Sequence, residues 1–288
     1  MPKNSQGVAL KTASQFDESC VIFHVAHDST VIPHAVRDQF LLNDVELEIE
    51  LIQMTDHLTY DLVCGLSPEA NIVRAPVSRL VVDVERFEND ELEPMAKIGM
   101  GAVYRVTHDL RHLRRTITSE ERQHLIAKWY SPHHERLTQR VDRALDMNAQ
   151  ALVIDIHSYP SRALPYEAFQ QAVRPEICIG SDPAHTSNQL ADNALNIFRN
   201  AGFTVGLNTP FSGALVPIKH YGKDKRVSAV MLEIRRDLYL NEETGKANGN
   251  YAQFKIKLTN CLHRLIQNAE ANVKLPPKIN QGARQCVI

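Results

Sequence analysis

The chain has 288 residues, and its 32 Lys and Arg against 34 Asp and Glu give a formal net charge of −2. This near balance predicts no nucleic-acid partner, because such surfaces need an excess of basic residues. No apolar run approaches the roughly 18 residues of a membrane span, so we expect no membrane association. A hydrophobic content of 43% is ordinary for a globular protein that buries a sizeable core.

The cysteines point to a reducing compartment. They are odd in number, widely scattered and without a Cys-x-x-Cys pair: Cys20, Cys64, Cys178, Cys261 and Cys286. This pattern argues against a disulfide framework and against a structural cysteine-zinc site. The first 20 residues contain charged side chains and no apolar core, so no signal peptide is visible. We therefore expect a cytoplasmic protein.

Short apolar runs alternate with helical patterns along the chain. The apolar runs predict strands at 21–26, 71–74, 80–84, 151–158, 176–180, 203–208 and 227–234. Helical spacing predicts helices over about 38–50, 119–148 with an interruption at Pro132, 187–201 with Gly202 as its C-cap glycine, and 251–271. A short helix through Cys64 could be capped by Thr55 or Asp56. Residues 87–118 are poorly periodic, as in a substrate-covering loop.

This alternation predicts an α/β fold. We expect a single domain over 21–272, with a mixed, mainly parallel central sheet covered by helices on both faces. Residues 1–20 are expected to form a flexible arm and residues 273–288 a C-terminal tail. Neither a Gly-x-Gly-x-x-Gly nor a Gly-x-x-x-x-Gly-Lys motif occurs, so the usual phosphate cradle of nucleotide-binding folds is missing from the sequence.

Polar residues able to do chemistry stand at the ends of two predicted strands, and the two histidines among them are candidate metal ligands. Asp155 and His157 share one face of the strand at 151–158, and His27 follows the strand at 21–26. Open α/β sheets bind their ligands beyond the carboxyl ends of the strands. Two imidazoles and one carboxylate, with a fourth position left for water, form the arrangement of a catalytic zinc site. Spacing alone permits either Asp28 or Asp56 as the acid, and such ligands also accept other divalent metals.

Charged residues near these ends suggest further roles. Glu233 is the only acid in the predicted strand at 227–234, and burying it is costly unless a partner or a function holds it. It is a candidate for moving a proton of the attacking water, and its alternative is a pair with Arg235 or Arg236. Arg79 and Arg86 flank the predicted strand at 80–84. If both guanidinium groups face the crevice, the substrate is anionic.

Ordered motifs from about residue 21 to 240 resemble the N-formylglutamate amidohydrolase family, zinc enzymes with a fold like that of zinc carboxypeptidases. The most specific match is Ser78-Arg-Leu-Val-Val-Asp-Val-Glu-Arg86, which is similar to the family's Ser-Arg-Tyr-Val-Val-Asp-Leu-Asn-Arg. The shorter matches are Ala26-His-Asp-Ser29, Thr55-Asp-His57, Pro132-His-His134, Asp155-Ile-His-Ser158, Phe211-Ser-Gly213, His220-Tyr-Gly222 and Leu232-Glu233 to Tyr239. Each is weak alone, but their order is preserved.

The resemblance implies a role for each matched residue. One zinc ion would fall to His27, Asp56 and His157, and Glu233 would be the base that activates water. Arg79 and Arg86 would bind substrate carboxylates, and His134 or His220 would steady the tetrahedral oxyanion. The implied reaction is hydrolysis of the N-acyl amide of a small acidic amino acid, first of all N-formyl-L-glutamate to formate and L-glutamate.

Three positions depart from the family's motifs. Asp28 replaces a small residue, His57 replaces an aromatic one, and Glu85 replaces an Asn beside Arg86. A negative charge at Glu85 would partly neutralise Arg86 and weaken the capture of an anion. The alternatives are therefore a broader N-acyl amino acid or peptide hydrolase, and a catalytically silent relative that binds a metal or an anion. The sequence predicts no oligomeric state.

Overall fold

The computed structural model describes residues 19–170 and 173–273 and has a six-stranded sheet at its centre. The strand order is β2-β1-β3-β6-β4-β5. All neighbours pair in parallel except β4 and β6, which are antiparallel. The strands are β1 (Val21–Val25), β2 (Ile72–Arg74), β3 (Ala151–Tyr159), β4 (Ile177–Gly180), β5 (Val205–Leu207) and β6 (Val227–Arg235). A small hairpin of β7 (Leu240–Asn241) and β8 (Lys246–Ala247) stands apart. The predicted mixed, mainly parallel sheet is confirmed.

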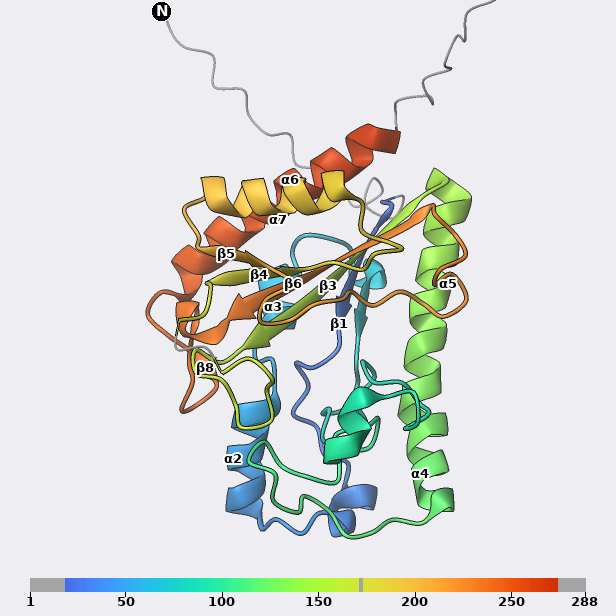
Figure 1. The fold of residues 1–288 in the computed structure, drawn as a ribbon, viewed down its shortest axis with the longest axis vertical. Helices are drawn as coiled ribbons and strands as arrows, with labels where there is room; N and C mark the ends of the chain where they lie inside the picture. The colour runs from blue at the N-terminus through green and yellow to red at the C-terminus, as the bar shows by residue number, and fades with distance from the viewer. Residues whose placement is uncertain (1–18, 171–172, 274–288) are drawn as a thin grey trace, which may run out of the picture.

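Helices lie on both faces of this sheet (Figure 1). The α-helices are α2 (Asp44–Met54), α3 (Thr59–Val63), α4 (Ser119–Leu125), α5 (Ser131–Asn148), α6 (Asn188–Asn200) and α7 (Tyr251–Val273). The 3-10 segments are η1 (His34–Gln39), η2 (Glu69–Asn71), η3 (Pro94–Ile98) and η5 (Arg236–Leu238), and η4 (Ile126–Tyr130) is a π-helical turn. The α6 helix ends as predicted, since Gly202 follows it with φ +83.

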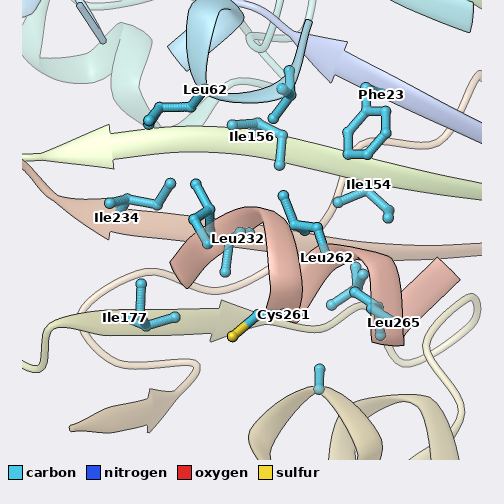
Figure 2. Packing of buried hydrophobic residues seen from close by; sticks show 14 of the residues in the cluster. Phe23, Leu62, Ile154, Ile156, Ile177, Leu232, Ile234, Cys261, Leu262 and Leu265 are labelled. Carbon is cyan, nitrogen blue, oxygen red and sulfur yellow. The ribbon is translucent and has the colours of Figure 1, made fainter. Parts of the chain in front are cut away.

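The strands divide their side chains between two cores. On one face, Ile154, Ile156 and Leu232 pack with α3, α6 and α7 (Figure 2). On the other face, Ile22 and Val153 pack against α5. Because side chains alternate along a strand, the polar residues His24, Asp155 and His157 fall on the α5 face.

Three local predictions are wrong. Residues 80–84 are buried, but they form turns and no strand, and Leu80, Val81 and Val82 pack in a core with α2 and α4. Neither Thr55 nor Asp56 caps α3, whose N-cap is Leu58 in a left-handed conformation. The long helix is interrupted by η4 before Pro132, which fits instead into the first turn of α5. Asp56 is thus left available for another role.

The sheet brings the candidate residues to one edge. The parallel strands β1, β3 and β6 end at the same side, where His27 follows β1 and His157 lies near the end of β3. In the β3–β6 register, Glu233 stands directly beside His157. Side chains paired in this way point to the same face of the sheet. His157 and Glu233 therefore face the same crevice.

Within the described residues, the structure bears on the cysteines and on membrane-spanning helices. The four described cysteines, Cys20, Cys64, Cys178 and Cys261, are free thiols. Within these ranges, the helices are all too short or too polar to cross a membrane. The predicted tail beyond Val273, which ends α7, and most of the predicted arm lie outside the described residues, so the domain limits stay predictions.

Candidate metal centre and catalytic cleft

His27, Asp56 and His157 meet in the wall of a cleft of about 1260 Å³. Asp56 Oδ2 lies 3.1 Å from His157 Nδ1 and 3.6 Å from His27 Nδ1. All three residues are buried, and one ligand atom from each fits within 4.8 Å of the others. The structure thus brings together the three residues that the family resemblance implied as zinc ligands.

Two carboxylates fix the orientation of both imidazole rings. His27 Nε2 lies 2.7 Å from Asp83 Oδ1, and His157 Nε2 lies 3.0 Å from Asp155 Oδ1. A carboxylate accepts hydrogen bonds, so these pairs place a ring hydrogen on Nε2 in both histidines, and His27 Nδ1 keeps a lone pair. His157 Nδ1 also donates to Asp56 Oδ2, because Asp155, Asp56 and Glu85 outweigh burial and raise the pKa of His157 well above its usual range. A bound metal ion would take the place of that Nδ1 hydrogen. Both Nδ1 atoms face Asp56 Oδ2, and His27 Nδ1 has no hydrogen-bond partner among the described residues. Two imidazole nitrogens and a carboxylate oxygen that converge in this way fit a divalent ion such as zinc.

Asp56 is held by Arg236, which follows β6. Arg236 Nη2 donates to Asp56 Oδ1 at 3.0 Å, and its Nε donates to Ser158 Oγ at 3.2 Å. Burial would raise the pKa of Asp56, but the hydrogen bond with His157 and the nearby His27 and Arg236 outweigh it and hold that pKa well below its usual range. Asp28, the other acid that spacing allowed, instead pairs with Arg74 at 2.7 Å. The geometry therefore favours Asp56 as the third ligand.

Glu233 is a buried carboxyl group on the wall of the cleft. Its Oε2 has no hydrogen-bond partner in the described chain, and Arg236, one of the two arginines considered as its partner, bonds Asp56 instead. Burial, with added repulsion from Asp56 and Asp155, raises the pKa of Glu233 to about 8. A carboxyl group whose pKa is raised in a cleft is suited to accept and return a proton.

This raised pKa predicts a pH-dependent stability of the metal-free protein. Between pH 4.5, the ordinary pKa, and about 8, the folded state keeps the Glu233 proton while the unfolded state releases it. The unfolded state then binds fewer protons, so the free energy of unfolding falls as pH rises through this window. Urea unfolding of chelator-treated protein should show this fall, and Glu233→Gln should reduce it. An equal pH dependence in both proteins would contradict the assigned pKa.

The two arginines line the cleft but differ in their contacts. Arg79 donates to Asp83 at 2.8 Å and to the Tyr104 hydroxyl at 3.1 Å. These hydrogen bonds within the protein orient Asp83. The nearest carboxylate oxygen to Arg86 Nε is Asp83 Oδ2 at 3.8 Å, and this Nε has no hydrogen-bond partner among the described residues. Arg86 is therefore the arginine with donor capacity left for a substrate.

The two histidines suggested for the oxyanion are placed differently from the prediction. His134 lines the cleft, but its Nε2 donates to the Val84 carbonyl at 2.9 Å, which leaves a lone pair on Nδ1. Burial and the charge of His24 lower the pKa of His134 to about 4, so at neutral pH it has no second hydrogen to donate. His220 bonds Asp142 at 2.9 Å and is absent from the residues that line the cleft. Neither histidine is positioned as an oxyanion donor.

Glu85 contacts histidines and does not neutralise Arg86 as the sequence suggested. Its Oε1 lies 3.0 Å from His24 Nδ1 and 3.6 Å from His157 Nε2. Burial and the nearby Asp155 would raise the pKa of Glu85, but its interactions with His157 and His24 outweigh them and lower it to about 2. The charge of Glu85 is thus balanced by histidines, and it need not neutralise Arg86.

The sequence did not reveal which residues support the site. Asp83, Asp155 and Arg236 each bond a candidate ligand, but Asp155 was noted only as a polar neighbour of His157 and Arg236 only as a possible partner of Glu233. One signal existed: Asp155 shares a strand face with His157 two residues away. For Arg236, whose partner Asp56 is 180 residues distant, the sequence offers no local signal.

Sequence similarity links the chain to one protein family. The family model described as N-formylglutamate amidohydrolase matches residues 19–240. A curated N-formylglutamate deformylase from Pseudomonas aeruginosa is 28% identical over 181 residues, which are 60% of this chain. The match spans 66% of that relative's length, slightly under two thirds.

Two solved structures share the fold. An N-formylglutamate amidohydrolase from Ralstonia eutropha JMP134 superposes with a TM-score of 0.76 at 20% identity, covering 88% of this chain and 95% of that one. A gene product from Agrobacterium tumefaciens superposes with a TM-score of 0.64 at 22% identity, covering 88% and 92%. At these low identities the two structures show a common fold, but they do not identify the substrate of this chain.

Proposed function

This chain belongs to the N-formylglutamate amidohydrolase family, and we propose that it hydrolyses the N-acyl amide of a small acidic amino acid, first of all N-formyl-L-glutamate, to formate and L-glutamate. The proposal is carried by one observation. The unpartnered Nδ1 of His27, the Nδ1 of His157 and Asp56 Oδ2 converge beside the buried Glu233.

His27, Asp56 and His157 would hold one zinc ion. When bound there, zinc supplies Lewis acidity toward the acyl carbonyl and lowers the pKa of water. Asp83 and Asp155 keep the two rings in the tautomer that leaves Nδ1 free to bind, and Arg236 keeps Asp56 Oδ2 turned toward them. Other divalent metals would fit the same donor set.

Glu233 would take the proton of the attacking water and give it to the leaving amine. Its position beside His157 in the β3–β6 register puts it next to the ligand cluster. Arg86, on the wall of the same cleft, would bind a carboxylate of the substrate with its guanidinium group, and Arg79 would act mainly by holding Asp83. The reacting amide would thus lie between the metal centre and the arginine.

The direct test is a formate-release assay on the purified chain with measured metal content. We expect N-formyl-L-glutamate to be hydrolysed much faster than N-formyl-L-glutamine, which has the same shape but no side-chain carboxylate. Equal rates for both would favour a broader N-acyl amino acid or peptide hydrolase. The cleft of about 1260 Å³ favours that second candidate, because it has room for a larger substrate. Bound metal without any hydrolysis would indicate a silent relative.

The arginine assignment predicts a selective loss. Arg86→Gln should lower kcat/KM for N-formyl-L-glutamate about 10- to 100-fold, since a hydrogen bond between charged groups is worth about 1.5–3 kcal/mol. A rise in KM should carry most of the change. The matched control is Arg136→Gln, which removes an exposed arginine of α5 that is not among the cleft-lining residues. An unchanged KM in Arg86→Gln would remove this residue from substrate binding.

A further inference from the structure

A second cluster of ligand-type side chains lies on the other side of the His157 ring. His24 of β1 has its Nδ1 2.8 Å from Asp155 Oδ1 and 3.0 Å from Glu85 Oε1. His24 and Asp155 are fully buried, and the Glu85 side chain is 15% exposed. One ligand atom from each of the three lies within 4.8 Å of the others. The first cluster uses Nδ1 of His157, whereas the second lies toward Nε2.

Hydrogen bonds alone leave this cluster unsatisfied. His24 Nδ1 can carry a single hydrogen and direct it at one oxygen, but two carboxylate oxygens approach it. Glu85 Oε1 is the one left over, because it has no hydrogen-bond partner within the described ranges. A buried acceptor without a partner costs about 1–3 kcal/mol, and more when it is charged. A cation at this point would interact with both carboxylate oxygens, which a single hydrogen does not.

The outer nitrogen of His24 is positioned as in a metal-binding histidine. His24 Nε2 lies 2.8 Å from Nε2 of His133 on α5, so one of the two nitrogens donates and the other accepts. Without an ion the His24 ring is charged and also carries a hydrogen on Nδ1, which points at Asp155. A cation in place of that hydrogen would meet the Nδ1 lone pair beside Asp155 and Glu85, while the Nε2 hydrogen stays directed at His133. Metal-bound histidines commonly donate their other ring N–H to a neighbouring acceptor in this way.

We propose that His24, Glu85 and Asp155 form a second divalent-cation site, distinct from the cluster of His27, Asp56 and His157. Two carboxylates and one imidazole supply the charge and the donor types that bind zinc or a similar ion. Donor atoms about 2 Å from one ion lie roughly 3 Å apart, close to the spacings around His24 Nδ1. Glu85 and Asp155 both line the cleft, which gives an ion a path of entry. The proposal does not rest on the hydrolysis proposed above.

The test counts ions in the full-length chain. The protein is stripped with a chelator and titrated with Co²⁺, following visible absorption and measuring bound cobalt after gel filtration. We expect two ions per chain in the wild type and one in Glu85→Gln, which keeps the shape of the side chain and removes its charge. Glu88→Gln is the matched control, since it removes an exposed carboxylate of the same cleft and should leave two ions.

Several results would overturn the second site. Saturation of the wild type at one ion that Asp56→Asn loses would do so, as would a Glu85→Gln protein that binds as many ions as the wild type. His24→Gln, titrated in the same way, should also bind one ion, which preserves the test if Glu85→Gln does not fold. Asp56→Asn should lose the first ion and keep the second, so that failure of the first site is seen separately from failure of the second.

Discussion

Glu233→Gln should keep the metal of the first cluster and lose most of the turnover, with kcat lower by about 10²- to 10⁴-fold. This range is the usual contribution of a positioned general acid or base. The substitution preserves the volume of a buried side chain while it removes the ability to accept a proton. Because Glu233 lies beside the ligand cluster and is not part of it, metal affinity should change little. Steady-state formate release and metal content measured on one sample check both halves of the prediction.

Glu135→Gln provides the comparison. Glu135 is an exposed carboxylate that lines the same cleft from α5, so its substitution changes the charge of the cleft equally. We expect near-wild-type turnover in that variant. Normal turnover in Glu233→Gln would exclude Glu233 as the base, and an equal loss in both variants would point to the overall charge of the cleft.

The central strands and their polar ends could be predicted because the evidence for them is local. An unbroken apolar run followed by Asp155 and His157 specifies a buried strand with a polar carboxyl end. Parallel pairing then brings the ends of such strands to one edge without further information. For this reason the meeting of His27 with His157, and the place of Glu233 beside them, followed from the sequence and the family's motif order.

The wrong predictions share another cause. The apolar run at 80–84 is buried as deeply as a strand, but Leu80, Val81 and Val82 are buried by packing in turns against α2 and α4. Periodicity does not distinguish a buried turn from a short buried strand. Likewise, a motif resemblance places His134 near the cleft but does not say which ring nitrogen carries the hydrogen. That property depends on the Val84 carbonyl, 50 residues away.

The second large effect concerns Asp56. Asp56→Asn removes the only carboxylate of the first cluster and leaves two neutral imidazoles, so that site should lose zinc affinity by more than 100-fold. This estimate is a lower bound, because even partners that only orient a ligand are worth about 10–100-fold in metal affinity. Hydrolysis should fall with occupancy. The readout is the rise in Tm on adding zinc, which depends on binding to the folded state.

Asp28→Asn is the matched control for this prediction, since Asp28 is the other acid that spacing allowed and its structural partner is Arg74. That variant should keep the zinc-dependent rise in Tm attributable to the first cluster, together with its hydrolysis. The buried Arg236 would lose its charged partner in Asp56→Asn, so metal-free Asp56→Asn should also be less stable than metal-free Asp28→Asn. If Asp28→Asn loses the metal and Asp56→Asn keeps it, the ligand assignment is reversed and the acid next to His27 in the chain completes the site.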